Sequence, residues 1–202
     1  KLILGIGDWV FHEACRQVAR WRTSFRPNFQ ISINTSLVQY KNNAFNVKNW
    51  PEHLKTLELP GNAIAVEITE GILMESEASV DKILLDFRDA NIQVLIDDFG
   101  TGYSSLSTLK KLGIDYLKID KSFVENLEPD SDDLALCEAI IGLAHKLDLK
   151  VIAEGIETAK QRDLLIAAGC DYGQGYFFSK PLPELEFDTL LKSIGGHFRF
   201  AG

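Results

Sequence analysis

The chain has 202 residues, of which 46% are hydrophobic and 25% are charged, and this balance is typical of a globular protein. It excludes a disordered chain, a collagen and a disulfide-rich scaffold. The formal net charge is −8, so we expect no binding of DNA or RNA through a basic surface. No apolar run approaches the roughly 20 residues of a membrane-spanning helix.

The cysteines and the first residue indicate the setting of the chain. Cys15, Cys137 and Cys170 are odd in number and form no C-x-x-C pair, which predicts buried, reduced thiols in a cytoplasmic protein. The sequence opens on Lys1, and its only methionine is Met74. We therefore expect a piece of a longer parent protein, which other regions could anchor to a membrane.

The first part of the chain predicts one long helix and one short strand. Apolar residues at helical spacing predict a helix over 7–21, with Asp8 as its N-cap. Its buried face is expected to hold Ile6, Val10, Ala14, Val18 and Trp21. A short apolar run over 29–33 predicts a strand that leads into Asn34, and a helix is expected before Leu57.

From residue 64 onward the sequence alternates between strands and helices. Strands are predicted over 64–66, 92–96, 116–119, 150–153 and 170–178. Helices are predicted over 80–87, 104–112, 134–147 and 185–191, and a further one begins at a capping box of Thr158 and Gln161. Short apolar strands that alternate with helices are typical of a parallel sheet covered on both faces.

This alternation of strands and helices predicts an α/β fold, and the length of the chain favours an incomplete barrel. Six strand–helix units follow the first helix, whereas a (β/α)8 barrel has eight units in about 250 residues. We therefore expect a TIM-like (β/α)8 barrel with about two N-terminal strands missing from this chain. An open doubly wound sheet is the alternative, and the absence of its Gly-rich turn after the first strand disfavours it.

Polar side chains stand at the carboxyl ends of the predicted strands. They are Asn34, Glu67, Asp97 with Asp98, Lys118 with Asp120, Glu154, and Gln174. In a parallel barrel these ends meet at one face, where the chemistry of such barrels is found. Several of the acids have apolar neighbours on both sides, and buried carboxylates must be paired or bind a cation.

The composition of this set indicates a site for hard metal ions. Carboxylate and amide oxygens, without a His or Cys ligand pattern, favour Mg²⁺ or Mn²⁺ over zinc. Two such ions are a common device for phosphodiester hydrolysis. Lys118 would orient or activate the attacking water, or stabilise charge on the phosphate. The stretch 98–105, with Gly100 and Gly102, predicts a sharply bent loop.

Six motifs lie in order along the chain. They are SINTS at 32–36, EITE at 67–70, DDFGTGYSSL at 97–106, LKID at 117–120, VIAEGIET at 151–158 and GQGY at 173–176. With them the chain resembles the EAL-domain family of bacterial cyclic di-GMP phosphodiesterases, from about Leu2 to Leu191. The resemblance implies a TIM-like barrel whose first strand is antiparallel, two Mg²⁺ or Mn²⁺ ions, and hydrolysis of cyclic di-GMP to linear pGpG.

The resemblance also implies a role for each matching residue. The metal ligands, direct or through water, would be Asn34, Glu67, Asp97, Asp98 and Glu154. Lys118 would contact the nucleophilic water and, with Glu154, form the catalytic pair. The supporting residues would be Glu70, which holds the 98–105 loop, Glu157 nearby, Asp120, and Gln174 in the metal–water network. A homodimer and sensory or GGDEF-type domains in the parent chain are the partners implied.

One departure from the family pattern concerns its namesake. The Glu-Ala-Leu signature, followed by an arginine, is not in this sequence, and Glu13-Ala14-Cys15 belongs to a helix instead. We expect residues 1–202 to be an N-terminally truncated phosphodiesterase domain whose signature lies upstream. This expectation concerns the full domain and does not include activity of residues 1–202 alone.

Two other functions compete with the hydrolase. A degenerate EAL barrel could bind cyclic di-GMP as a receptor, and loss of the upstream glutamate would favour this. Lys118 could instead form a Schiff base, as in an aldolase, but the surrounding carboxylates would keep its amine protonated. The full set of matching acids favours the hydrolase.

Overall fold

The computed structural model describes residues 2–41, 49–74, 78–100, 109 and 112–193. It comprises two compact units, the first from residues 1–96 and 102–115 and the second from residues 97–101 and 116–202. Both contain parallel strands and helices, so the predicted α/β class is confirmed. Within the described residues, no helix has the length and apolar character needed to span a membrane.

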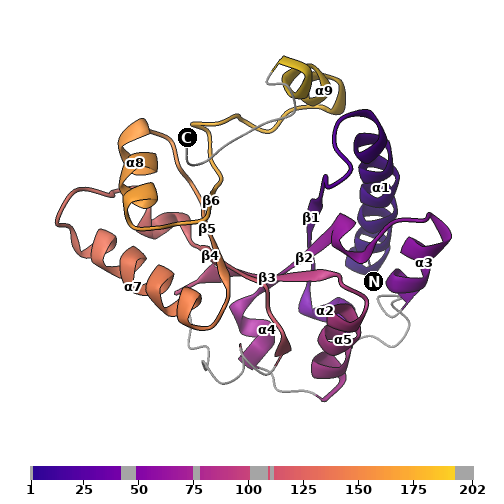
Figure 1. Ribbon diagram of the computed structural model, residues 1–202. Helices are drawn as coiled ribbons and strands as arrows, with labels where there is room; N and C mark the ends of the chain where they lie inside the picture. The colour runs from indigo at the N-terminus through magenta and orange to yellow at the C-terminus, as the bar shows by residue number, and fades with distance from the viewer. Residues whose placement is uncertain (1, 42–48, 75–77, 101–108, 110–111, 194–202) are drawn as a thin grey trace. The chain divides into compact units, whose positions relative to one another are not determined.

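The first unit is built on three strands in chain order (Figure 1). Its elements are α1 (Leu2–Ser24), β1 (Ile31–Asn34), α2 (Leu37–Lys41), α3 (Trp50–Thr56), the 3-10 turn η2 (Gly61–Ala63), β2 (Ile64–Thr69), α4 (Glu70–Met74), α5 (Ala78–Asp89) and β3 (Gln93–Phe99). The last residues of β3 belong to the second unit. Strands β1 and β2 pair in parallel, with Ile31 opposite Ile64 and Asn34 opposite Glu67.

Helix α1 is longer than predicted, and its predicted buried face is confirmed at Ala14, Val18 and Trp21 but not at Ile6. It begins at Leu2, so Asp8 lies within the helix and the predicted N-cap is wrong. Ile6 is 46% exposed, whereas Phe11 is fully buried. The Phe11 ring stacks on Trp50 of α3, with ring centres 4.2 Å apart, and this contact turns the helix toward α3. The helix also packs against β1, β2 and α2.

Gly7 lies inside helix α1, at a close contact with α2. A Cβ atom at this position would lie 2.2 Å from the Gln39 side-chain nitrogen. The glycine therefore allows α1 to approach α2 closely, and it does not mark a helix end.

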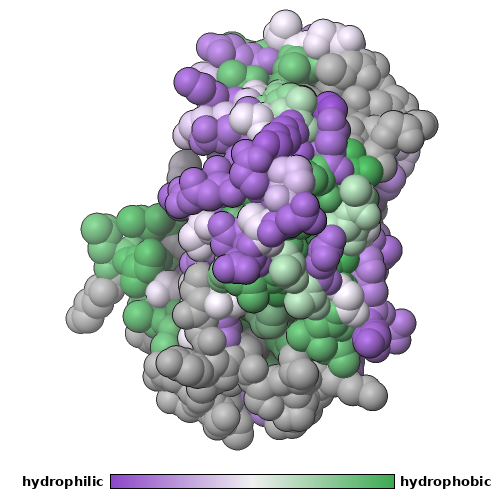
Figure 2. All heavy atoms as spheres, turned by 90° about the vertical axis from the view of Figure 1, so that its left-hand side faces the viewer, coloured by the Kyte–Doolittle hydropathy of each residue, from purple (hydrophilic) through white to green (hydrophobic). Residues whose placement is uncertain are grey.

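The second unit contains three more strands in chain order. Its elements are β4 (Tyr116–Ile119), the 3-10 turn η3 (Lys121–Phe123), α7 (Asp132–Lys146), β5 (Lys150–Ala153), α8 (Ala159–Ala167), β6 (Tyr172–Gly173) and α9 (Glu184–Ser193). The pairs β4–β5 and β5–β6 are parallel, and α7 packs on β4 and β5. Hydrophilic side chains dominate the outer face of α7 and α8 (Figure 2).

Most predicted elements of this unit are confirmed, and β6 is the exception. The bounds of β4 and β5 and the capping box of Thr158 and Gln161 agree with the sequence analysis. Strand β6 has only two residues instead of the nine predicted, because the chain turns after Gly173. In that turn the Phe178 amide donates to the Gly175 carbonyl oxygen over 3.1 Å.

Two further predictions have different outcomes. Cys15, Cys137 and Cys170 are buried free thiols, as predicted. The antiparallel strand implied by the resemblance is not among the described strand pairs, and it stays a prediction for sequence upstream of Lys1.

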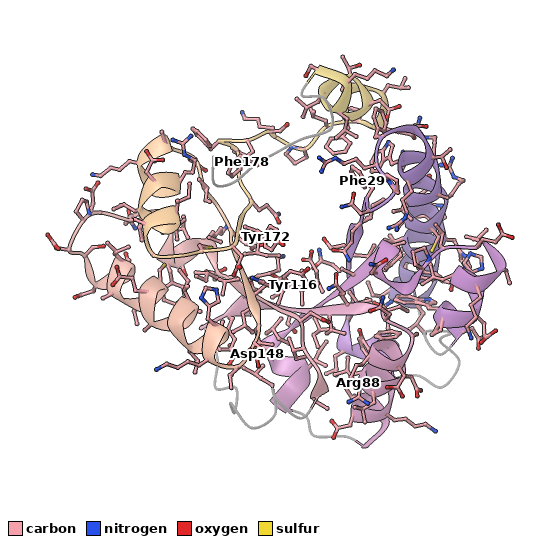
Figure 3. The ribbon with its side chains drawn as sticks, in the orientation of Figure 1. Phe29, Arg88, Tyr116, Asp148, Tyr172 and Phe178 are labelled. Carbon is pink, nitrogen blue, oxygen red and sulfur yellow. The ribbon has the colours of Figure 1, made fainter. Side chains whose placement is uncertain are left out.

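A repeated Gly-x-Asp-Tyr sequence, which the sequence analysis missed, secures the amino ends of two strands. It occurs at 113–116 and at 169–172, and both glycines have positive φ. The Asp115 carboxylate accepts the amide N–H of Val94 over 2.8 Å, and the Asp171 carboxylate accepts that of Val151 over 3.0 Å. The rings of Tyr116 and Tyr172 lie 6.0 Å apart (Figure 3).

The two aspartates differ in their charged neighbours. Asp171 also accepts from the Lys150 ammonium over 2.6 Å and lies 2.8 Å from the His145 Nε2 atom. Burial alone would raise the pKa of Asp171, but the bonds from Lys150, His145 and Val151 lower it overall. Burial raises the pKa of Asp115, despite the bond from Val94.

We predict that Asp171→Asn lowers the free energy of unfolding by about 2 kcal/mol at neutral pH. The pKa of Asp171 is lower in the folded chain, so its charge contributes stability above the unfolded pKa. That contribution is lost as the pH falls through the folded pKa, and the variant should then approach the wild type. Urea unfolding across the acid range measures the difference.

The control is Asp115→Asn. The raised pKa of Asp115 means that its charge opposes folding, so this variant should lose less stability at neutral pH. A loss at Asp171 that is the same at every pH would show that its charge contributes nothing.

Candidate functional site

The second unit gathers three acidic side chains around one lysine. Asp97 and Asp98 lie near the end of β3, Lys118 lies within β4, and Glu154 directly follows β5. The Glu154 amide donates to the Ile119 carbonyl oxygen over 3.1 Å, so pairing continues past the end of β5. The parallel register therefore brings these residues to one edge of the unit, as the sequence predicts.

Lys118 is the centre of this cluster. Its side chain is 4% exposed, and its ammonium lies 2.9 Å from the Asp97 Oδ1 atom and 2.5 Å from the Glu154 Oε1 atom. The two carboxylates therefore share one buried positive charge. This pairing offsets part of the cost of burying three charged groups.

Asp98 has a backbone conformation that is uncommon for its residue type. Its φ is +54°, in the left-handed region that non-glycine residues rarely adopt. Desolvation and the nearby charge of Asp97 raise the pKa of Asp98, and its hydrogen bond with Asp120 adds to this. Strain and a disfavoured charge at one residue are typical of a site built for a ligand.

Asp120 caps the turn that follows β4. Its Oδ1 atom accepts the Ser122 amide over 2.9 Å. Burial alone would raise the pKa of Asp120, but the hydrogen bonds from Ser122, Asp98 and the Lys121 amide lower it overall. A hydrogen bond between the two carboxyl groups needs one shared proton, which Asp98 holds more readily than Asp120.

Three of these acids have the arrangement of a metal site. Ligand oxygens of Asp97, Asp98 and Glu154 lie within 4.8 Å of one another. An all-oxygen donor set of this charge fits a hard divalent cation such as Mg²⁺ or Mn²⁺. A cation here would favour the charged form of Asp98 and replace the proton shared with Asp120.

The first unit has its own pair of polar strand ends. Asn34 and Glu67 are register partners on β1 and β2, and Glu67 is buried. The Thr35 amide and hydroxyl both donate to the Glu67 carbonyl oxygen, each over 2.9 Å. Thr35 is not among the predicted site residues, although it belongs to the SINTS motif. These bonds hold the ends of β1 and β2 together.

The supporting residues are distributed over both units. Glu70 is buried where β2 passes into α4. Gln174 is exposed, and its amide donates to the Ala153 carbonyl oxygen over 2.8 Å. Glu157 is exposed as well. Residues 101–105 of the predicted loop and most of the predicted helix 104–112 lie outside the described residues, so the role of Glu70 toward that loop stays a prediction.

Gln161 has a second role that the capping box did not reveal. Its side-chain oxygen accepts the amides of Glu157 and Thr158, over 2.8 and 2.9 Å. Its nitrogen donates to the carbonyl oxygens of Val124 and Glu125, over 3.0 and 3.1 Å. The buried amide thus ties the segment after Glu154 to the turn after Asp120, and only the structure could show this second pair of bonds.

Gly155 lets the same two segments approach. Its φ is +70°, and a Cβ atom there would lie 2.6 Å from the Lys121 Cβ atom. Any larger residue would push Glu154 away from the lysine cluster.

Comparisons with known proteins identify the family of the chain. The sequence model of the EAL domain matches residues 1–181. The bifunctional diguanylate cyclase/cyclic di-GMP phosphodiesterase MucR of Pseudomonas aeruginosa is 38% identical over 96% of this chain and 28% of its own length. The chain spans about a quarter of the length of the curated relatives it matches.

Solved structures give the same result. The MucR phosphodiesterase in complex with c-di-GMP is 38% identical, with a TM-score of 0.85 over 92% of this chain and 80% of that one. The EAL domain of Mycobacterium smegmatis DcpA is 38% identical, with a TM-score of 0.87 over 96% and 86% of the two chains. The chain belongs to the EAL domain family.

Proposed function

We propose that this domain hydrolyses cyclic di-GMP to linear pGpG with two Mg²⁺ or Mn²⁺ ions. The observation that carries the proposal is the carboxylate cluster of Asp97, Asp98 and Glu154 around the buried Lys118. The names of the matching relatives, which include a cyclic di-GMP phosphodiesterase, support the same reaction and substrate.

The second unit would hold cations through Asp97, Asp98 and Glu154. Asn34 and Glu67, which are register partners in the first unit, are the further metal ligands that the family resemblance implies. When bound, the ions supply positive charge to the phosphodiester and lower the pKa of the attacking water. Asp120 and Gln174, at the ends of β4 and β6, would keep the surrounding water in place. Glu70 and Glu157 would support the neighbouring loops.

Lys118 would act on the attacking water. Its ammonium is fixed between two carboxylates and has little freedom to move. A fixed donor of this kind costs no reorganisation while charge develops in the transition state. The same two carboxylates favour the charged ammonium and so disfavour a Schiff base, which needs the neutral amine.

We prefer a hydrolase of cyclic di-GMP to a receptor because every acid of the six matching motifs is present. A receptor that only binds cyclic di-GMP has no need of three converging carboxylates beside a lysine. A homodimer, sensory or GGDEF-type domains in the parent chain and a cytoplasmic setting complete the proposal.

We predict that hydrolysis stops when divalent metal is removed. Excess EDTA should abolish pGpG formation, and Mg²⁺ or Mn²⁺ should restore it. Ca²⁺ should inhibit, because its longer bonds and variable geometry distort a two-ion site. Chromatography of the products measures the reaction, and undiminished pGpG in EDTA would refute the role of metal.

We predict that Lys118→Ala lowers kcat by about 100-fold or more, because its ammonium acts mainly as the nucleophile attacks. Binding of cyclic di-GMP, measured by calorimetry in Ca²⁺, should be retained. Lys146→Ala is the matched control, since this lysine is exposed in the last turn of α7. Lost binding with an unchanged kcat would make Lys118 a substrate contact instead.

A further inference from the structure

Two histidines meet on neighbouring helices of the first unit. His12 lies on α1 and His53 on α3, and the His12 Nδ1 atom is 3.0 Å from the His53 Nε2 atom. Their ring centres are 4.3 Å apart, and the rings are perpendicular. Neither residue belongs to the motifs of the candidate site.

The packing beneath this pair fixes its position. Phe11, next to His12, is fully buried, and its ring stacks on Trp50, one helical turn before His53. Trp50 and Leu54 are 1% and 2% exposed, and they anchor α3 on both sides of His53. The short contact between the two imidazoles therefore follows from the core of the unit.

We propose that His12 and His53 form a chelate for a borderline divalent transition metal such as Cu²⁺, Ni²⁺ or Zn²⁺. Two imidazole nitrogens bound to a tetrahedral zinc lie about 3.3 Å apart, given a Zn–N distance of about 2.05 Å. The observed 3.0 Å is close to this separation, and a rotation of both rings would turn their lone pairs from each other toward one ion. The His12 side chain is 47% exposed, which leaves room for water as the remaining ligands.

The hydrogen bonding of the pair supports this assignment. The contact between the nitrogens needs one shared proton, which a metal ion would replace. The Asp8 Oδ1 atom lies 3.7 Å from the other nitrogen of His12. This separation is too long for a hydrogen bond, but the carboxylate adds negative charge beside a cation bound to His12.

This site would differ in chemistry from the carboxylate cluster. Nitrogen ligands favour Cu²⁺ over Ni²⁺ and Zn²⁺ and bind Mg²⁺ poorly, whereas the oxygen cluster suits Mg²⁺. The two sites can therefore be tested separately in the same protein.

The test is Cu²⁺ binding to the purified protein in the presence of excess Mg²⁺. The electron paramagnetic resonance spectrum of the wild type should show coupling to two imidazole nitrogens. His12→Gln and His53→Gln should each weaken Cu²⁺ binding about 100-fold, and Asp8→Asn should weaken it less. Circular dichroism verifies that each variant is folded.

His145→Gln is the matched control, because His145 is an exposed helical histidine that also faces an aspartate. Its Cu²⁺ binding should equal that of the wild type. A spectrum with oxygen ligands only, or equal binding in all three histidine variants, would overturn the proposal. Because this readout does not use cyclic di-GMP or activity, its failure leaves the proposed hydrolase function untouched.

Discussion

The candidate site depends on one buried ammonium that neutralises carboxylates brought together by the sheet. Asp97 lies near the end of β3 and Glu154 directly follows β5, so parallel packing places them together despite their mutual repulsion. Lys118, itself 4% exposed, bonds to both and makes this convergence tolerable. Desolvation and Asp97 still disfavour the charged form of Asp98, and a cation would stabilise that form. The same arrangement therefore serves folding and the proposed chemistry.

The strands could be predicted from the sequence because each is a short apolar run that ends at a polar residue. Strands β4 and β5 follow this rule without exception, and their bounds agree with prediction. Helix α1 departs from prediction because Asp8 suggested an N-terminal cap, whereas the helix begins at Leu2. Gly7 contacts the Gln39 side chain, and Phe11 of the same helix stacks on Trp50. Both partners lie more than 30 residues further along the chain. Local spacing carries no information about such contacts.

Much of the candidate site was also visible in the sequence. Carboxylates at strand ends were sufficient to select Asp97, Asp98 and Glu154, because the fold class dictates where those ends meet. The second role of Gln161 was hidden, since a capping box explains the residue fully at the local level. The His12 and His53 pair was hidden for a related reason, because 41 residues separate them and no local motif joins them. Sequence reasoning thus finds groups that follow from topology and misses those that follow from side-chain packing.

Aspartates at the two ends of the strands show how one residue type serves opposite purposes. At the amino ends, Asp115 and Asp171 each accept a backbone amide of the preceding strand, so their oxygens satisfy the sheet. At the carboxyl ends, Asp97 and Asp98 face other carboxylates and the lysine, so their oxygens remain directed at a place where a cation is favourable. A carboxylate that accepts hydrogen bonds from the backbone satisfies buried amides of the fold. Carboxylates that converge repel one another, and this repulsion raises the energy of the folded chain until a cation binds. The direction of the strands separates the two groups of aspartates, because a parallel sheet gathers all the carboxyl ends of its strands on one side. This separation lets the domain tolerate a strained, charged centre without weakening the strands that carry it.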